Sequence, residues 1–404
     1  MLSSKPSHTH SNLINPYSLA GMSATLVGVG IGRFAYIALM PALIHAGWFN
    51  ASEASYLGAA TLFGYILGAP ASSYLTKYLN VVFLVRIAML LSSFSFLGCA
   101  IQDAPFSYYF VLRSIAGTTG AMLMILAPPL IVRLHRPEMK ARVSGIIFSG
   151  VGLGVMLAGT LLPLIISTSI SAAWLVLGLI TLLASALSWR TWSISDLKAH
   201  YATSSAKLST LSSAKKSTLL MLVIAYSLDA LGYLPHTLFW VDFIVRDLGQ
   251  SLAFGGLMWA IFGIGAALGP LLAGMLGDKF NLKSALYWAF LLKSIGVFMP
   301  LVSTHSSALA LSSLLVGLFT TGTVALVSAY SLECVGYELN TKAWGMLTMA
   351  FALSQGGFGY LYANLAPSMN SYQPLFAFSS AALIVALLCI KFSQSNHNHQ
   401  NKEC

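Results

Sequence analysis

The stretch Ala20–Ala46, AGMSATLVGVGIGRFAYIALMPALIHA, contains Arg33 as its only residue with a full charge at neutral pH. A helix that spans a bilayer needs roughly 20 mostly apolar residues, because lipid offers backbone N–H and C=O groups no hydrogen-bond partner. Similar apolar runs recur at 106–132 and 143–166. The sequence therefore predicts a chain that crosses a membrane several times as α-helices.

The composition indicates the same class of protein. Of the 404 residues, 57% are hydrophobic and 8% are charged, whereas soluble domains carry about 25% charged residues. We attribute the net charge of +10 to Lys and Arg retained in cytoplasmic loops, and expect no nucleic-acid partner. The four cysteines lie far apart without a C-x-x-C pair, so we expect no disulfide framework, metal site or cofactor: Cys99, Cys334, Cys389 and Cys404.

Breaks between the apolar runs predict an all-α membrane protein with twelve transmembrane helices. The expected spans are 17–45, 53–77, 80–101, 106–132, 142–167, 171–192, 218–245, 252–276, 284–303, 307–331, 342–365 and 372–392. Residues 193–217 are rich in Ser, Thr and Lys and lack hydrophobic periodicity, which is typical of a linker. We expect a tail at 1–16, six-helix bundles at 17–192 and 218–392 joined by this cytoplasmic linker, and a tail at 393–404.

The loop charges predict how the chain lies in the membrane. With both termini on the cytoplasmic side, nearly all loop Lys and Arg residues fall on that side, and Arg246 alone falls in the outer loops. This asymmetry is the one expected of cytoplasmic loops. The halves also repeat weakly: Phe63-Gly64 and Pro70 are echoed by Phe262-Gly263 and Pro270. Internal repeats are common in transporters, whose two halves rock about a shared site.

Arginines at membrane depth are candidate solute ligands. A charged residue at a helix centre costs about 2.5–3.5 kcal/mol on insertion scales, so it persists where it faces a cavity, a solute or a partner. Arg33 follows three alternating glycines and precedes Tyr36, and we expect both side chains to bind solute. The alternative is an Arg33 that ties helix carbonyls together. For Arg113, the alternatives are solute binding and an extension of the side chain to the membrane interface.

Asp229 is the candidate proton-coupling residue. A carboxylate at membrane depth can load and release protons, whereas facing Arg33 or Arg113 would make it half of a static ion pair; lining a cavity is the third alternative. His236 and Gln355 are candidate solute ligands, with hydrogen bonding between helices as the alternative. We expect Lys293 to be lipid-facing or packed without a functional role. Three charged residues near the outer surface are expected to be solvated: Asp242, Arg246 and Asp247.

These residues resemble the major facilitator superfamily, which has twelve helices in two six-helix bundles. Residues 274–283, GMLGDKFNLK, are similar to its Gly-x-x-x-Asp-Arg/Lys-x-x-x-Arg/Lys loop. The resemblance implies a gating role for Gly274, Asp278, Lys279 and Lys283. The counterpart loop in the first half, at 74–79, lacks the Gly and the Asp. Arg113 with Gly117 and Gly120 is similar to a helix-four motif that is often linked to proton coupling.

A narrower resemblance is to the YbfB/YjiJ-type branch, whose members are bacterial inner-membrane proteins. It is carried by residues 30–36, GIGRFAY, by 56–60, YLGAA, and by 231–236, LGYLPH. The resemblance implies a monomeric, multi-pass protein with both termini in the cytoplasm. Its partners would be a small-molecule solute, protons and the lipid bilayer.

The function expected from this resemblance is secondary active transport of a small organic solute by alternating access, coupled to protons. The two arginines favour an anionic solute, whereas the aromatic content of 12% favours a proton-driven multidrug-type exporter as the alternative. A membrane-embedded enzyme or a receptor is the weakest alternative, because hydrolase and metalloprotease motifs are absent from the sequence. The sequence also lacks a P-loop, so ATP is not expected to drive transport.

Overall fold

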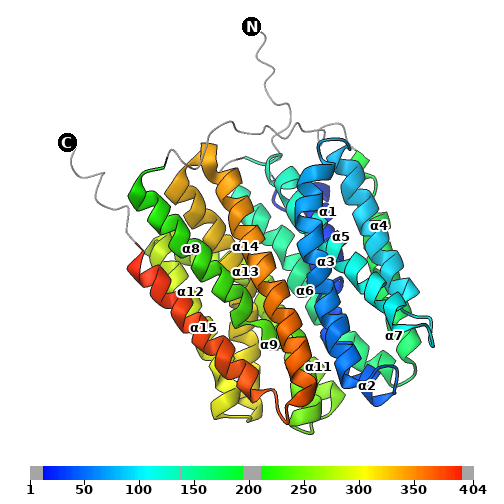
Figure 1. Ribbon diagram of the computed structural model, residues 1–404. Coiled ribbons are helices and arrows are strands. Elements are labelled where there is room, and N and C mark those ends of the chain that lie inside the picture. The colour runs from blue at the N-terminus through cyan, green and yellow to red at the C-terminus, as the bar shows by residue number, and fades with distance from the viewer. Residues whose placement is uncertain (1–11, 137–138, 194–210, 394–404) are drawn as a thin grey trace, which may run out of the picture.

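The computed structural model describes residues 12–136, 139–193 and 211–393. Long helices lie side by side over these ranges and are joined by short turns (Figure 1). The first part of the chain forms α1 Pro16–Thr25, the π-helical η1 Leu26–Ile31, α2 Ala35–His45, α3 Ala51–Leu75, α4 Val81–Gly98, α5 Phe106–Val132, α6 Lys140–Ile166, α7 Ile170–Ser188 and the short η3 Thr191–Ser193. The second part forms α8 Ser213–Gly232, α9 Leu234–Leu238, α10 Trp240–Asp242, the π-helical η6 Phe243–Asp247, α11 Leu252–Phe280, α12 Leu282–Val302, α13 Ser306–Val335, α14 Tyr337–Leu365, the short η7 Ala366–Ser368 and α15 Gln373–Phe392.

Nine stretches of the described chain are long and apolar enough to cross a membrane. The first, Pro16–His45, runs through α1, η1 and α2 as one crossing, which we call helix 1. Three further helices, α3, α8 and α14, have 25, 20 and 29 residues, and these lengths also suffice to cross a bilayer. They are not among the nine stretches because of their lower hydropathy or higher charge. The all-α membrane fold is confirmed, and the pattern is consistent with the twelve predicted spans. We call α8, α9, α10 and η6 together helix 7.

The first two long helices begin at capping residues that the sequence provides. Asn15 accepts hydrogen bonds from the backbone N–H groups of Tyr17 and Ser18 at the start of α1. Asn50 accepts one from the N–H of Glu53, whose carboxylate accepts one from the N–H of Asn50 in return. These side chains satisfy N–H groups that the first turn of a helix leaves unpaired.

The linker prediction differs from the structure where the second half begins. The helix α8 begins at Ser213, capped by Ser212, so Lys215 and Lys216 lie in its first turn rather than in a linker. Residues 194–210 of the predicted linker, most of the tail at 1–16 and nearly all of the tail at 393–404 lie outside the described residues. The division into bundles at 17–192 and 218–392 stays a prediction.

Glycines allow the helices of the first half to approach closely. Gly117 of α5 lies directly against the backbone of Thr61 in α3, so an added Cβ would collide with the Thr61 carbonyl oxygen. Gly64 of α3 lies in the same way against Ser114 of α5. Backbones pack this closely in membranes where small residues line the contact.

Substitution of Gly117 by alanine should therefore lower the free energy of unfolding by about 1–3 kcal/mol, because one methyl group overpacks a backbone contact. Gly357 of α14 is the matched control, since an added Cβ there meets no atom within 4 Å. Gly357→Ala should leave stability unchanged or raise it slightly, because alanine favours the helix. Thermal unfolding of the two purified variants measures the difference; equal stability would contradict the close contact at Gly117.

Two lines of contact join the halves of the chain. The helix α6 lies along α11, and α3 lies along α14. Between α3 and α14, Tyr56 donates a hydrogen bond to the side chain of Asn364 at 2.9 Å, and its ring lies 5.5 Å from that of Tyr360. We call the end of the molecule where α1 begins and α15 ends the terminal end, and the opposite one the distal end. These contacts lie toward the distal end, and the two helices diverge toward the terminal end (Figure 1).

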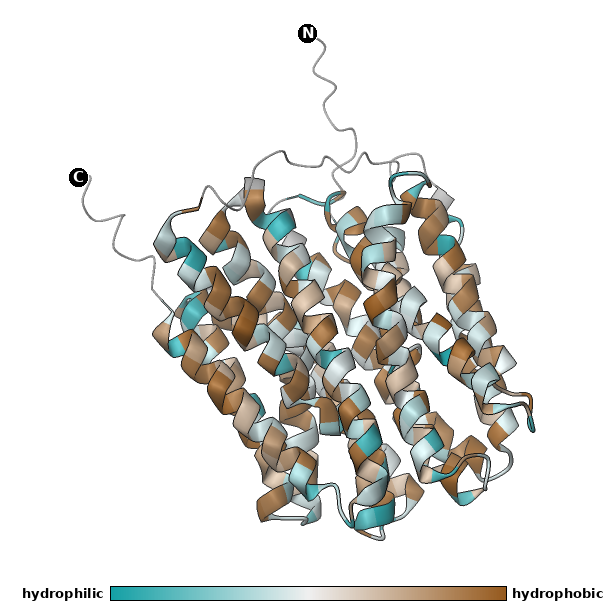
Figure 2. Ribbon diagram, viewed as in Figure 1, coloured by the Kyte–Doolittle hydropathy of each residue, from teal (hydrophilic) through white to brown (hydrophobic). Residues whose placement is uncertain are grey.

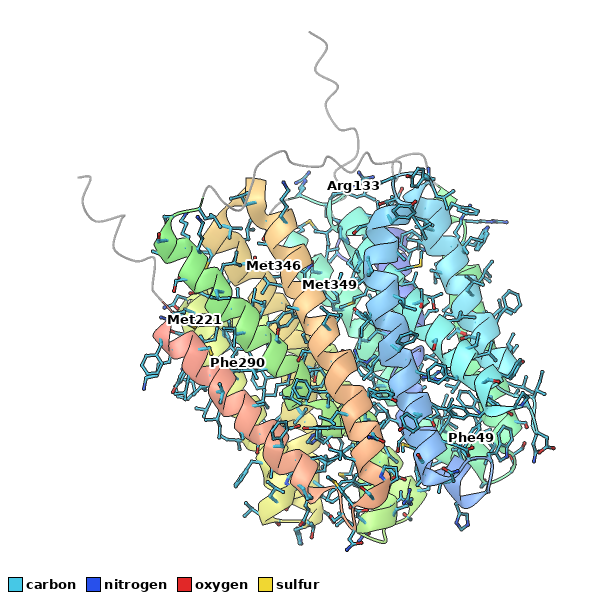
Figure 3. All side chains as sticks on the ribbon, viewed as in Figure 1. Phe49, Arg133, Met221, Phe290, Met346 and Met349 are labelled. Carbon is cyan, nitrogen blue, oxygen red and sulfur yellow. The ribbon has the colours of Figure 1, made fainter. Side chains whose placement is uncertain are left out.

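The outer surface of the helices is apolar. Figure 2 shows hydrophobic residues along much of α15 and α4, on the outside of the molecule. Phe378 and Ile384 of α15 are about half exposed, at 53% and 51%. Exposed side chains of this kind along a membrane-spanning helix face lipid, so the chain needs no polar cover along its length. Met346 and Met349 mark the part of α14 that diverges from α3 (Figure 3).

Candidate functional site

Helix 1 is broken next to Arg33. The π-helical η1 ends at Ile31, a turn follows at 32–34, and α2 begins at Ala35. Gly30 lies against the backbone of Gly150 and Gly154 in α6, which accounts for one of the alternating glycines. At the break, the carbonyl of Phe34 accepts from the N–H of Ile37 at 3.4 Å and also from the indole N–H of Trp259 in α11 at 3.2 Å. Discontinuous helices of this kind form the solute sites of many transporters.

Arg33 is buried, and no acidic side chain of the described residues forms an ion pair with it. Its residue is 8% exposed, and its guanidinium carbon lies 4.9 Å from the ring centre of Phe34 and 6.0 Å from that of Tyr65 in α3. Its Nε and Nη2 atoms are buried, and neither has a hydrogen-bond partner among the described residues. Buried donors are usually paired, so this guanidinium has the capacity to bind a further acceptor.

Helix 7 is also broken, and it carries an ion pair. The breaks lie at Tyr233 and Phe239, where the backbone leaves helical geometry. Just before the first break, Asp229 accepts a hydrogen bond from the ammonium group of Lys293 in α12 at 2.8 Å, and both residues are fully buried. The Lys293 nitrogen also lies 4.0 Å from the ring centre of Tyr233. A buried ion pair is retained only with good geometry and such added contacts.

Tyr233 connects this ion pair to the surroundings of Arg33. Its hydroxyl accepts a hydrogen bond from the side-chain amide of Gln355 in α14 at 2.9 Å. Both Arg33 and Asp229 lie near enough to act electrostatically on its phenol. We define the central cluster as the six residues that these contacts join: Arg33, Tyr65, Asp229, Tyr233, Lys293 and Gln355. The cluster brings together helices 1 and 7 with α3, α12 and α14.

Lys293 was missed by sequence reasoning. It is packed and not lipid-facing, and it is the counter-ion of Asp229, a contact that the sequence did not indicate. The ion-pair alternative for Asp229 holds, with Lys293 in place of Arg33 or Arg113. One signal was present: Lys293 lies near the middle of the span 284–303, where an unpaired ammonium group is most costly.

Arg113 and Tyr36 lie in a separate aromatic cage. The guanidinium of Arg113 donates a hydrogen bond to the Thr61 hydroxyl at 2.9 Å. It lies 5.0, 5.3 and 5.9 Å from the ring centres of Tyr36, Phe96 and Trp174. Tyr36 donates to the carbonyl of Ala54 at 2.7 Å. Arg113 is 2% exposed, so its side chain packs within the first half of the chain instead of extending to the membrane interface.

His236 is enclosed within the second half of the chain. Its ring lies parallel to that of Trp240 at 4.2 Å, and its Nε2 is 2.9 Å from the hydroxyl oxygen of Ser312 in α13. No three His, Cys, Asp or Glu side chains of the described chain are grouped as metal ligands.

The residues of the predicted gating loop lie mostly within helices, because α11 continues to Phe280 and α12 begins at Leu282. Gly274 has open space around it, and Lys279 is exposed with its nitrogen 5.2 Å from the ring centre of Phe280. Lys283 donates to the carbonyl of Ser393 and so ties the start of α12 to the end of α15. The side chain of Asp278 lies outside the described residues.

Asp242 is not solvated, and that prediction is wrong. The residue is 0% exposed, and its Oδ2 atom accepts hydrogen bonds from the hydroxyl of Tyr372 and, at 3.2 Å, from Arg246. The sequence places Asp242 near the end of an apolar run, where solvation is the default expectation. The fold covers it, because the turn before α15 brings Tyr372 over the carboxylate.

A bundle of apolar helices with two broken helices and buried charges beside the breaks defines a helical membrane transporter. The chain belongs to the family within the major facilitator superfamily whose model is described as "Uncharacterised MFS-type transporter YbfB", which matches residues 25–391. This match confirms the resemblance. Proteins of this family are transporters and not enzymes, so the chain is a transporter.

Relatives and a solved structure agree with this assignment. A putative metabolite transport protein of Haemophilus influenzae is 23% identical over 404 residues, covering 94% of this chain and 97% of its own. The sialic acid transporter NanX of Escherichia coli is 26% identical over 131 residues, so that match spans about a third (32%) of each chain. The xylose transporter XylE from E. coli, in a partially occluded inward-open conformation, shares the fold with a TM-score of 0.72 and 14% identity, over 94% of this chain and 98% of its own.

Proposed function

We propose that the chain is a secondary active transporter that moves a small organic anion by alternating access and is coupled to protons. The central cluster is the solute and coupling site in this proposal. The chain acts as a monomer in a bacterial inner membrane, with its terminal end in the cytoplasm, and the loop charges support this orientation. The distal end then faces the outside, and the contacts of Tyr56 with Asn364 and of Phe34 with Trp259 close it.

The observation that carries the proposal is the unpartnered guanidinium of Arg33. Two of its nitrogens are buried without an acceptor among the described residues, beside a break in helix 1 and near the rings of Phe34 and Tyr65. A carboxylate meets both donors in the planar geometry that guanidinium favours. The rings bury apolar parts of the same solute. A relative that transports sialic acid, which is itself an acid, supports this class. A cationic drug would be repelled by Arg33.

The pairing of Asp229 with Lys293 supports the proposed proton coupling. When Asp229 binds a proton, its carboxylate becomes a neutral acid and the ammonium of Lys293 loses its counter-ion. The local charge rises by one beside Tyr233, whose phenol Arg33 also affects. A more positive cluster attracts an anionic solute, and solute binding in turn favours proton uptake. This reciprocity is what coupling of two sites requires.

The paired substitution Asp229→Asn with Lys293→Gln tests the coupling. It removes both charges of the ion pair, so no uncompensated charge stays buried. Proton-driven uptake should fall at least tenfold, because the carboxylate that binds the proton is absent. Exchange of labelled for unlabelled solute at equal pH should persist, because Arg33 is unchanged.

The measurement uses proteoliposomes with an imposed pH gradient, sialic acid and other carboxylates as solutes, and cationic dyes as the competing class. Wild-type transport of the dyes without any carboxylate would favour the multidrug-type exporter and contradict the anionic solute. If the paired variant still accumulates solute along a pH gradient, Asp229 is not the coupling residue.

A further inference from the structure

Helix 7 carries a buried histidine and a buried carboxylate that the mechanism above does not use. His236 and Asp242 follow Asp229 toward the distal end, and all three residues are 0% exposed. At about 1.5 Å per residue, they lie about 10 and 9 Å apart along the helix axis. Each has one buried atom without a hydrogen-bond partner in the described part of the chain: Asp229 Oδ2, His236 Nδ1 and Asp242 Oδ1. Buried polar atoms are rarely left unpaired, so the recurrence along one helix needs an explanation.

The Asp242 site has an excess of acid. Its Oδ2 accepts from Tyr372 and Arg246, while Asp247 accepts a hydrogen bond from the N–H of Tyr372 at 2.7 Å. Tyr372 thus brings Asp247 next to Asp242, and among the described residues Asp242 forms its ion pair with Arg246, whose side chain is 37% exposed and so reaches the surface. Tyr36 of α2 is near enough to Asp242 to interact with its charge. Its hydroxyl, however, donates a hydrogen bond to the carbonyl of Ala54. A buried site with surplus negative charge favours the uptake of a proton.

The hydrogen bonds of His236 fix its tautomer. The Ser312 hydroxyl donates its one proton to the carbonyl of Gly296 at 2.6 Å. It must therefore accept from His236, so the proton of the neutral imidazole is on Nε2 and Nδ1 is a bare acceptor. The ring is held by Trp240 and Phe376. The positive charge of Lys293 acts on this imidazole and opposes its imidazolium form, so the ring holds an extra proton only in passing.

The two breaks in helix 7 lie between these residues. Tyr233 separates Asp229 from His236, and Phe239 separates His236 from Asp242. The carbonyls at the two breaks stay paired, Tyr233 with the N–H of Thr237 and Phe239 with that of Phe243. Buried water pairs instead with side-chain atoms that lack a partner, such as the three named above. Water molecules held at these atoms would span the two gaps, which are too long for direct transfer.

We propose that Asp242 is a second proton-binding site and that Asp242 and His236 pass protons from the distal surface to Asp229. This rests on the proton coupling proposed above. A proton from the distal solution binds Oδ1 of Asp242. It passes to Nδ1 of His236, which becomes an imidazolium, and then to Oδ2 of Asp229, which becomes a neutral acid. Lys293 stays an ammonium throughout, and each donor returns to its starting form, so one proton is transferred in total.

The test uses proteoliposomes on a solid-supported membrane and needs no identified solute. A jump to lower pH on the distal side should drive a transient charge displacement in the wild type, because protons move part of the way across the membrane. Asp242→Asn should reduce this displacement at least tenfold, since an amide cannot carry the proton. His236→Gln should do the same, while its amide still donates to Ser312. Asp242→Glu should restore it.

Two controls separate proton transfer from a structural role. Asp247→Asn changes a partly exposed carboxylate near Asp242 and should leave the charge displacement within twofold of the wild type. Tyr372→Phe removes the hydrogen bond to Asp242 but leaves Asp242, His236 and Asp229 in place. This variant should also keep the charge displacement within twofold of the wild type. If Tyr372→Phe lowers the displacement as much as Asp242→Asn, Asp242 only holds the fold and the proposal is overturned.

The outcomes also separate this proposal from the proton coupling on which it rests. One outcome overturns the proton path but keeps the proton coupling. In it, the charge displacement persists in Asp242→Asn and in His236→Gln but is lost in the paired Asp229 and Lys293 variant. No displacement in folded wild-type protein overturns both.

Discussion

Replacement of Lys293 by methionine is expected to lower the free energy of unfolding by about 3–5 kcal/mol, because it leaves a buried carboxylate without its counter-ion. Lys293 and Asp229 are fully buried and 2.8 Å apart, so solvent cannot replace the lost contact. Thermal or denaturant unfolding in detergent measures this change.

The paired substitution Lys293→Met with Asp229→Asn is the control for this prediction. It removes both charges, so it should recover most of the stability that the single substitution loses. A cycle of the two single variants and the pair gives the coupling energy. If each single variant is as stable as the wild type, the ion pair does not exist in the folded protein.

Replacement of Arg33 by glutamine should weaken carboxylate binding about 100-fold or more, because each charge-assisted hydrogen bond contributes about 1.5–3 kcal/mol. The same substitution should leave the free energy of unfolding unchanged or raise it by about 1–3 kcal/mol, since it removes buried donors that have no partner. Loss of function with retained stability is typical of a residue that serves a ligand and not the fold.

Arg113 provides the matched comparison. Arg113→Gln removes a guanidinium that contacts the Thr61 hydroxyl and three aromatic rings, so stability should fall. Solute binding to that variant, once folded, should change little. Isothermal titration with sialic acid, or with the carboxylate found by the transport assay, and thermal unfolding of both variants give the two readouts. Normal carboxylate affinity in Arg33→Gln would remove Arg33 from the solute site.

The family and the membrane class could be read from the sequence because both depend on local features. An apolar run such as 20–46 crosses a bilayer whatever its neighbours are, since each helix satisfies its own backbone hydrogen bonds. The motif around Arg33 needed no contacts to be identified. Turns and charges also predicted spans at 53–77, 218–245 and 342–365, where the structure has the long helices α3, α8 and α14, which are not among the nine most apolar stretches.

The partners of the charged residues could not be read from the sequence. Lys293 lies 64 positions from Asp229, and Tyr372 lies 130 positions from Asp242. Periodicity says which residues share a helix, but it does not say which face of one helix meets which face of another. For the same reason, two arginines that look alike in sequence differ in the fold. Arg113 donates to Thr61 within a cage of rings and has one buried nitrogen, Nε, without a partner among the described residues, whereas Arg33 has two, Nε and Nη2.

The sequence by itself determined that this chain crosses a membrane as helices, which family it resembles and which charges lie at membrane depth. These features follow from the cost of placing backbone groups and charges in lipid, residue by residue. The tertiary structure alone decided which of those charges are neutralised and where helices 1 and 7 break. A charge is neutralised by whichever group packing brings within a few ångströms, and that distance is set by all the helices together.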